Sequence, residues 1–218
     1  MKKERKCWMV KGIGCLAAFV VWTILIKTVD VQPLGQKGTD IGFAALNVWF
    51  HRITGVHLSL YYMTDWLGLV PVIICLLFGS LGFIQLCQRR SLWKVDHDLL
   101  VLGVYYVIVI LGYLVFEMIP INYRPILIDG RLEISYPSST TLLVMSVMPT
   151  LAEQINRRVK RICVKRWIVG FTGGFTAFMV IARTVSGVHW FTDIAGSVML
   201  SAGLFCIYKA FVLMDVRK

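Results

Sequence analysis

The sequence alternates between long apolar segments and short polar or charged ones. Four of the apolar segments are interpreted as membrane-spanning helices, since such a span takes about 20 residues. They are residues 12–26, 66–87, 99–119 and 194–214. Basic residues precede the first segment, as in a signal peptide, but no small-residue cleavage site follows it. We therefore expect this segment to be a retained anchor.

Two further segments, 141–151 and 167–182, are shorter or more polar than these four. Gly170, Gly173 and Gly174 in the second of them suit close helix packing. With these two segments, the pattern predicts an all-α, polytopic membrane protein built as a six-helix transmembrane bundle. No internal repeat or low-complexity tract divides the chain, so residues 1–218 are expected to form a single domain.

Composition supports the membrane assignment independently of the pattern. Hydrophobic residues make up 57% of the chain, and its mean hydropathy is +0.72. Soluble domains contain roughly 45–50% apolar residues. Lipid is therefore expected to cover much of the surface.

The net charge of +11 is unevenly distributed along the chain. When the 23 Lys and Arg residues are assigned to the loops of the six-helix prediction, 17 fall on the side of the termini and 6 on the other side. The positive-inside rule then places both termini in the cytoplasm and the remaining loops outside a cell membrane. The basic clusters are interpreted as topology signals that also attract anionic lipid headgroups. We expect no nucleic-acid partner, because no basic groove interleaved with aromatic residues is visible.

Three residues in the stretch 182–193 suggest phosphate chemistry. If this stretch starts a helix, His189 and Asp193 lie four residues apart on one face, so the carboxylate would hold one imidazole nitrogen and leave the other free. Arg183 would present its planar guanidinium to an anionic phosphoryl group beside the free nitrogen. The stretch therefore predicts a phosphate site with an oriented nucleophile or base.

A zinc site is the main alternative, because a His and a carboxylate one turn apart can both bind a metal. Such a site needs a third ligand. His97 is cytoplasmic in the predicted topology, and His51 and His57 belong to an outer loop that resembles an interfacial segment. We therefore expect no metal and no cofactor. A purely structural hydrogen-bond network is a second alternative, although ionisable groups at membrane depth favour a function.

The spacing of Arg183, His189 and Asp193 resembles the third motif of the type 2 phosphatidic acid phosphatases, a family related to the vanadium haloperoxidases. Arg124, followed by a proline, resembles the end of that family's first motif. Residues 137–140, Pro-Ser-Ser-Thr, resemble its second motif, which is usually Pro-Ser-Gly-His. Residues 42–47 resemble a segment common in its membrane members, so the resemblance covers nearly the whole chain. Of these matches, the third motif is the individually specific one.

The resemblance implies a mechanism without a metal. His189 would attack the phosphorus atom and form a phosphohistidine, while Asp193 would orient and stabilise the imidazole. Arg183 and Arg124 would clamp the phosphoryl oxygens. Such a site is sufficient in principle, because phosphoryl transfer depends mostly on positioning and electrostatics.

The region of the second motif contains candidate hydrogen-bond donors and also residues that differ from the family pattern. By resemblance, the Ser138 hydroxyl and the Ser139 backbone N–H would stabilise charge in the transition state. Thr140 stands where the family has the His that protonates the leaving group, and a Thr hydroxyl does not titrate near neutral pH. Glu117 stands where the family has a Lys, and Ala182 replaces a Ser. Thr140 and Glu117 are thus the candidates for an altered acid.

We expect an integral-membrane lipid phosphatase that hydrolyses a lipid phosphate or diphosphate at the outer face. The alternatives are a catalytically impaired phospholipid-binding member of the same scaffold and a lipid-head phosphotransferase. A transporter component is disfavoured, because the chain shows no paired broken helices in its two halves.

Overall fold

The protein is described by a computed structural model that covers residues 2–214. Arg217 and Lys218, which entered the charge argument, lie outside this range. The described part of the chain contains eight α-helices and no strand. The helices are α1 (Lys2–Thr28), α2 (Ala44–Thr54), α3 (Leu58–Leu67), α4 (Leu69–Arg89), α5 (His97–Met118), α6 (Ser139–Arg158), α7 (Ile162–Val185) and α8 (Phe191–Val212). Short 3₁₀ helices occupy Gln36–Gly38 and Leu92–Lys94.

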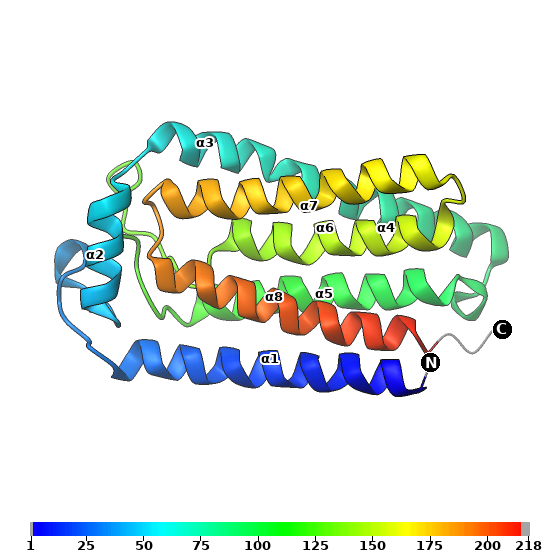
Figure 1. Ribbon diagram of the computed structural model, residues 1–218, viewed down its shortest axis with the longest axis horizontal. Coiled ribbons are helices and arrows are strands. Elements are labelled where there is room, and N and C mark those ends of the chain that lie inside the picture. The colour runs from blue at the N-terminus through cyan, green and yellow to red at the C-terminus, as the bar shows by residue number, and fades with distance from the viewer. Residues whose placement is uncertain (1, 215–218) are drawn as a thin grey trace.

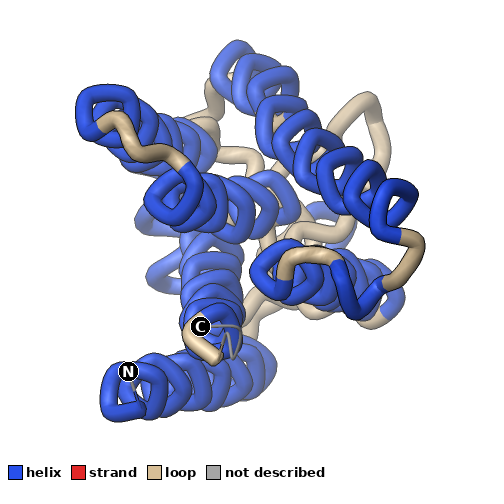
Figure 2. Tube along the Cα trace, turned by 90° about the vertical axis from the view of Figure 1, so that its right-hand side faces the viewer, coloured by secondary structure: helices blue, strands red, loops and turns tan. Residues whose placement is uncertain are grey.

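The long helices run side by side, and α2 lies across one end of the bundle (Figure 1). Figure 2 shows the bundle from the opposite end, where α1 begins. Helices α3 and α4 follow one another with only Gly68 between them, so residues Leu58–Arg89 form one apolar span. The loops that join α1 to α3, α5 to α6 and α7 to α8 gather at the end covered by α2 (Figure 1).

Five helical segments of the described chain are long and apolar enough to cross a membrane. They are Lys2–Thr28, Leu58–Arg89, His97–Met118, Ile162–Val185 and Phe191–Val212. Helix α6, the sixth span in the prediction, is not among them. It packs against α7 and α8 and buries Ser146, Thr150 and Gln154, so much of its surface faces protein and need not be apolar. The multi-pass, all-α fold is confirmed, whereas the count of six spanning helices stays a prediction.

The prediction that the α7 glycines provide close helix packing is wrong within the described chain, although α7 itself packs against α6. A Cβ added at Gly170, Gly173 or Gly174 would meet no atom of the described residues within 4 Å. Close approach occurs instead between α1 and α8, where a Cβ on Gly203 would lie 2.8 Å from the Leu16 side chain. The α7 glycines therefore lie on an open face of their helix, while Gly203 lets two spans touch.

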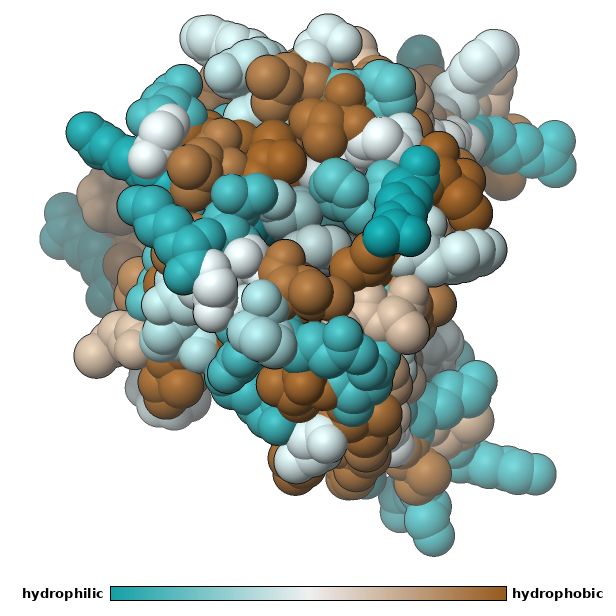
Figure 3. All heavy atoms as spheres, turned by 90° about the vertical axis from the view of Figure 1, so that its left-hand side faces the viewer, coloured by the Kyte–Doolittle hydropathy of each residue, from teal (hydrophilic) through white to brown (hydrophobic). Residues whose placement is uncertain are grey.

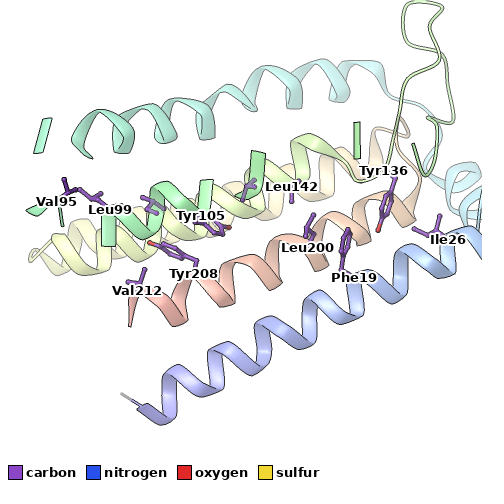
Figure 4. Close-up of a cluster of buried hydrophobic side chains, with 12 residues drawn as sticks. Phe19, Ile26, Val95, Leu99, Tyr105, Tyr136, Leu142, Leu200, Tyr208 and Val212 are labelled. Atoms are coloured by element: carbon purple, nitrogen blue, oxygen red, sulfur yellow. The ribbon is translucent and has the colours of Figure 1, made fainter. Parts of the chain in front are cut away.

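The largest apolar cluster runs the length of the bundle (Figure 4). Tyr136 lies at the loop end of the cluster, where its ring stacks on Phe19 with centroids 6.1 Å apart. The Tyr136 hydroxyl is 2.7 Å from the Thr23 hydroxyl, so α1 holds this ring by both its apolar face and its polar tip. The loop that leads into α6 is therefore anchored just before that helix begins.

The two ends of the bundle differ in chemistry. At the end with the loops, polar and charged residues are interspersed with apolar ones (Figure 3). At the other end, ion pairs join α4, α5 and α6: Arg89 pairs with Asp96 at 2.8 Å, and Arg158 pairs with Asp98 at 2.7 Å. Exposed pairs of this kind contribute little singly, but together they tie three helix ends.

Candidate active site

All three candidate motifs meet at the loop end of the bundle. Helix α7 ends shortly after Arg183, α6 begins after Ser138, and His189 lies in the loop just before α8. The prediction that His189 and Asp193 share one helical face is wrong, because α8 begins only at Phe191. Residues far apart in the sequence are nevertheless brought together here.

Ser135 lies between His189 and Asp193. Its Oγ is 2.9 Å from Nδ1 of His189 and donates a hydrogen bond to Oδ2 of Asp193 at 2.5 Å. In the described structure, Asp193 makes no direct hydrogen bond to the imidazole, contrary to the sequence-based expectation. The carboxylate is therefore connected to His189 through a hydroxyl rather than directly.

The carboxylate of Asp193 is fully buried and bound on both oxygens. The backbone N–H of Trp190 donates to Oδ2 at 3.0 Å, which also caps the first turn of α8. The amide Nδ2 of Asn122 donates to Oδ1 at 3.1 Å. Three donors thus satisfy the charge that burial would otherwise make costly.

The tautomer of His189 follows from its partners. Nδ1 lies 3.1 Å from the backbone carbonyl oxygen of Ser135, which only accepts, so Nδ1 carries the proton. Nε2 is then unprotonated, buried and without a hydrogen-bond partner in the described structure. Burial and the positive charges of Arg183 and Arg124 hold the pKa of His189 well below its ordinary 6.5. The free nitrogen therefore carries a lone pair and the ring is neutral at physiological pH, as an attacking imidazole requires.

Arg183 is 1% exposed and is held by α3. Its Nη1 donates to Oγ1 of Thr64 at 3.1 Å and pairs with Oδ1 of Asp65 at 3.3 Å. Its guanidinium carbon lies 4.6 Å from the ring centroid of Tyr61. Its Nε has no hydrogen-bond partner within residues 2–214, so one donor of this buried cation is available there.

Arg124 approaches the other side of the same region. Its Nη2 pairs with Oε2 of Glu133 at 3.1 Å, and its guanidinium carbon lies 5.4 Å from the ring of Tyr61. Its Nε and Nη1 are buried and have no hydrogen-bond partner among the described residues. Tyr61 contacts both arginines, and together the arginines offer three unsatisfied guanidinium nitrogens to an anion.

A polar cavity of about 380 Å³ joins part of these residues. Its lining includes Glu117, Arg124, Ser135, Ser139 and His189. The backbone N–H of Ser139 belongs to the first turn of α6, where helix N–H groups lack partners and favour anions. The cavity is therefore suited to a phosphoryl group beside the free imidazole nitrogen.

The second motif departs from its expected placement. The Ser138 hydroxyl donates to Oγ1 of Thr141 at 3.1 Å, and Ser138 does not line the polar cavity. Thr140 lines a neighbouring apolar cavity of about 330 Å³ together with Asp65. The two cavities share Tyr113 and Ser139. Of the two candidate acids, Glu117 thus lies in the same cavity as His189, whereas Thr140 does not.

A family model described as the PAP2 superfamily matches residues 99–217, which is more than half of the chain. The chain belongs to the PAP2 superfamily. Family membership supports a membrane phosphatase and agrees with the resemblance of the three motifs. The PAP2 match also covers every candidate site residue described so far except those of α3.

A solved PAP2 structure has a similar fold. It is the crystal structure of the first transmembrane PAP2-type phosphatidylglycerolphosphate phosphatase from Bacillus subtilis, with a TM-score of 0.66 and 18% sequence identity. The alignment covers 95% of this chain and 98% of that chain. At this identity the similarity shows the fold alone. No curated protein sequence matches the chain.

Sequence reasoning missed several residues of this PAP2 site. Ser135, Asn122, Tyr61 and Glu133 lie outside the motif spacings, and no local pattern distinguishes them. Asn47 had a signal, because it ends the family-like segment at residues 42–47, and it proves to be fully buried against α8. Within residues 2–214, no three His, Cys, Asp or Glu side chains lie together as a metal site would require.

Proposed function

We propose that this PAP2 protein is a lipid phosphatase in which His189 forms a phosphohistidine intermediate. The observation that carries the proposal is that His189 and Arg124 line one cavity, and that Nε2 of His189 and two guanidinium nitrogens of Arg124 are buried without a partner among the described residues. A nucleophile without a partner beside unsatisfied cationic donors is the arrangement expected of a phosphoryl-transfer site that awaits its anion.

The proposed reaction has two steps, formation of the phosphohistidine and its hydrolysis. The lone pair of Nε2 forms a bond to phosphorus while the bond from phosphorus to the lipid oxygen breaks, and that oxygen leaves with the electron pair. Water then attacks the phosphohistidine, the nitrogen–phosphorus bond breaks, and phosphate departs with regeneration of neutral His189. Arg124, Arg183 and the Ser139 N–H would stabilise the negative charge of both transition states.

The neighbouring apolar cavity supports a lipid as substrate. Leu69, Val109, Ile110 and Leu143 line this cavity, which meets the polar one at Tyr113 and Ser139. A phosphate in the polar cavity would leave an attached hydrocarbon chain room beside it. This supports a membrane lipid phosphate or diphosphate rather than a soluble ester.

We also propose that the site faces outward. The site lies at the loop end of the bundle, whereas the start of α1 and the basic segments around Arg89 and Arg158 lie at the opposite end (Figure 1). Basic loops stay in the cytoplasm, which supports an outward site with cytoplasmic termini.

The test is phosphate release from lipid phosphates by purified protein in detergent with EDTA. We expect His189→Ala to abolish release, and His57→Ala to serve as the matched control because the exposed His57 side chain contacts the Thr54 carbonyl and does not line the polar cavity. Turnover by His189→Ala would contradict the phosphohistidine route. Loss of activity with EDTA and its restoration by zinc would favour a metal mechanism.

A second candidate function is phospholipid binding without turnover. The observation that favours it is the pairing of both arginines with carboxylates, Arg124 with Glu133 and Arg183 with Asp65. Binding of a lipid phosphate without release of phosphate by the wild type would support this alternative. Transfer of the phosphoryl group to an added lipid alcohol would instead identify a phosphotransferase.

A further inference from the structure

We infer that Ser135 is a positioning residue that transmits the charge of Asp193 to the nucleophilic imidazole of His189. The inference rests on the proposed function and goes beyond it, because neither motif spacing nor family membership points to Ser135. It concerns one hydroxyl group between a carboxylate and a ring nitrogen.

The direction of the hydrogen bonds is fixed by their chemistry. An ionised Asp193 carboxylate can only accept hydrogen bonds, so the Ser135 hydroxyl donates its single proton to Oδ2. Its lone pairs then face Nδ1 of His189, 2.9 Å away. Nδ1–H therefore donates to a hydroxyl oxygen that is itself polarised by a negative charge. When phosphorylation at Nε2 makes the ring cationic, this oxygen stabilises the new charge.

The backbone around Ser135 holds its hydroxyl in place. Residues 122–124 and 133–135 pair as two short antiparallel segments: the Ser135 N–H donates to the Asn122 carbonyl at 2.9 Å, and the Arg124 N–H donates to the Glu133 carbonyl at 3.0 Å. The side chains of Asn122 and Ser135 bind opposite oxygens of the same carboxylate. One paired backbone segment thus sets both the charged group and the arginine that faces the cavity.

Ser135 also presents two different acceptors to His189. Its carbonyl oxygen lies 3.1 Å from Nδ1 and survives any side-chain substitution. Ser135→Ala therefore keeps the tautomer and removes only the connection to Asp193. This makes the substitution a selective probe, since alanine fits within the space of the buried serine.

The experiment measures steady-state kinetics on a lipid phosphate in detergent. We expect Ser135→Ala to lower kcat by about 10- to 100-fold, as expected for loss of a hydrogen bond to a charged group. KM should change by less than about twofold, because the interaction stabilises the transition state rather than bound substrate. The matched control is Ser146→Ala, a buried serine in α6 whose Oγ has no partner and which lies outside the cavity. It should leave kcat unchanged.

A double-mutant cycle distinguishes a role of Ser135 that depends on Asp193 from a general structural role of Ser135. If Ser135 acts through Asp193, then Ser135→Ala should have little further effect on kcat in an Asp193→Asn background. Independent, multiplicative effects would overturn the inference. So would wild-type kcat in Ser135→Ala while His189→Ala is inactive, and that result would leave the proposed function standing.

A spectroscopic measurement tests the contact without any turnover. The Nδ1 proton of His189 in the isotopically labelled full chain should resonate far downfield and move upfield in Ser135→Ala but not in Ser146→Ala. An unmoved resonance would overturn the inference even if the protein has no phosphatase activity. Activity retained by His189→Ala would contradict the proposed function and, with it, the catalytic part of this inference.

Discussion

The side-chain amide of Asn47 binds both the backbone and the side chain of Thr192. Nδ2 of Asn47 donates to Oγ1 of Thr192 at 3.0 Å, and Oδ1 accepts from the Thr192 N–H at 3.3 Å. Thr192 lies in the first turn of α8, next to Asp193. An amide from α2 therefore fixes the start of the helix that carries the buried carboxylate, across 145 positions of sequence.

We predict that Asn47→Ala destabilises the protein by about 2 to 4 kcal/mol, because it leaves two buried polar groups of Thr192 without partners. Turnover should fall as well, since the start of α8 loses its anchor. Thermal unfolding in detergent measures the first effect. The control is Asn156→Ala, whose side chain is exposed near the other end of the bundle; equal unfolding temperatures for the two variants would contradict the prediction.

Asp193→Asn should be more damaging than the loss of one charge suggests. The two carboxylate oxygens accept from Asn122 and from the Trp190 N–H, so an amide NH₂ on either side meets a donor. We expect a loss of stability of about 1–3 kcal/mol for the unsatisfied group, together with a fall in kcat. Chemical denaturation and kinetics check both effects. Unchanged stability would show that the site relaxes around the amide.

The pH dependence of activity follows from the depressed pKa of His189. The ring must be neutral to attack, and burial with the nearby arginine charges keeps it neutral below pH 6.5. Activity should therefore show no loss from this group between about pH 8 and 6.5. Stability should decline as pH falls below about 6.5, where the unfolded chain begins to bind a proton that the folded site resists.

Arg124→Gln should raise the pKa of His189 toward its ordinary value, because a positive charge that opposes protonation is removed. Histidine resonances followed through a pH titration measure the shift, with His189→Gln for assignment. The matched control is Arg131→Gln, an exposed arginine on the same loop. A lower pKa in Arg124→Gln would show that the arginine does not act electrostatically.

Thr140 stands where the resemblance places an acidic His, and this difference predicts which leaving group the protein favours. A lipid alkoxide resembles hydroxide, whose conjugate acid has a pKa of about 16, and needs protonation as it leaves. A phosphate monoester expelled from a diphosphate has a second pKa of about 6 and can leave unprotonated. We therefore predict faster turnover of an isoprenoid-type lipid diphosphate than of phosphatidic acid, with Thr140→His narrowing the difference.

Glu117 is the competing candidate acid, because it lines the polar cavity with His189. Kinetics on both substrates for Thr140→His and Glu117→Gln decide between the two. Turnover of phosphatidic acid equal to that of the diphosphate, combined with its collapse in Glu117→Gln, would make Glu117 the acid.

Topology can be measured directly by cysteine labelling of intact cells. In a background without the native cysteines, Arg131→Cys should react with an impermeant reagent, and Lys160→Cys should react only after permeabilisation. Both positions are exposed and lie at opposite ends of the bundle. The reverse pattern would move the site to the cytoplasmic leaflet.

The sequence predicted the fold well because membrane spans are specified by local composition. It was weakest for α6, whose buried Ser146, Thr150 and Gln154 are polar because protein rather than lipid surrounds them. It also assigned the close packing of α7 to the wrong face, because a glycine pattern does not indicate which face of a helix meets another helix. Gly203, which does permit close approach, ends the small-residue run 201–203, Ser-Ala-Gly, which the sequence analysis did not use.

For the candidate site, the motifs pointed to His189, Asp193, Arg183 and Arg124, which the structure places at one end of the bundle, but not to the connections between them. Ser135 joins two of these residues only because the loop 122–135 folds back on itself, and this pairing is set by tertiary structure. Tyr61, which contacts both arginines, comes from α3 and lies outside every motif. Motif spacing thus predicted the candidate reacting groups, whereas their hydrogen-bond partners depend on long-range folding.

Gly187 has a positive φ of 68°, and a Cβ there would overlap the backbone of Gly55. The loop that carries His189 therefore touches the segment that begins α3, where His57 N–H also donates to the Ser186 carbonyl at 2.9 Å. Helix α3 also carries Tyr61 and Asp65, which contact the arginines. The position of the His189 loop and the positions of the arginines therefore both depend on where α3 lies. For an engineer, any side chain at position 187 would act as a wedge between the His189 loop and the segment that leads into α3.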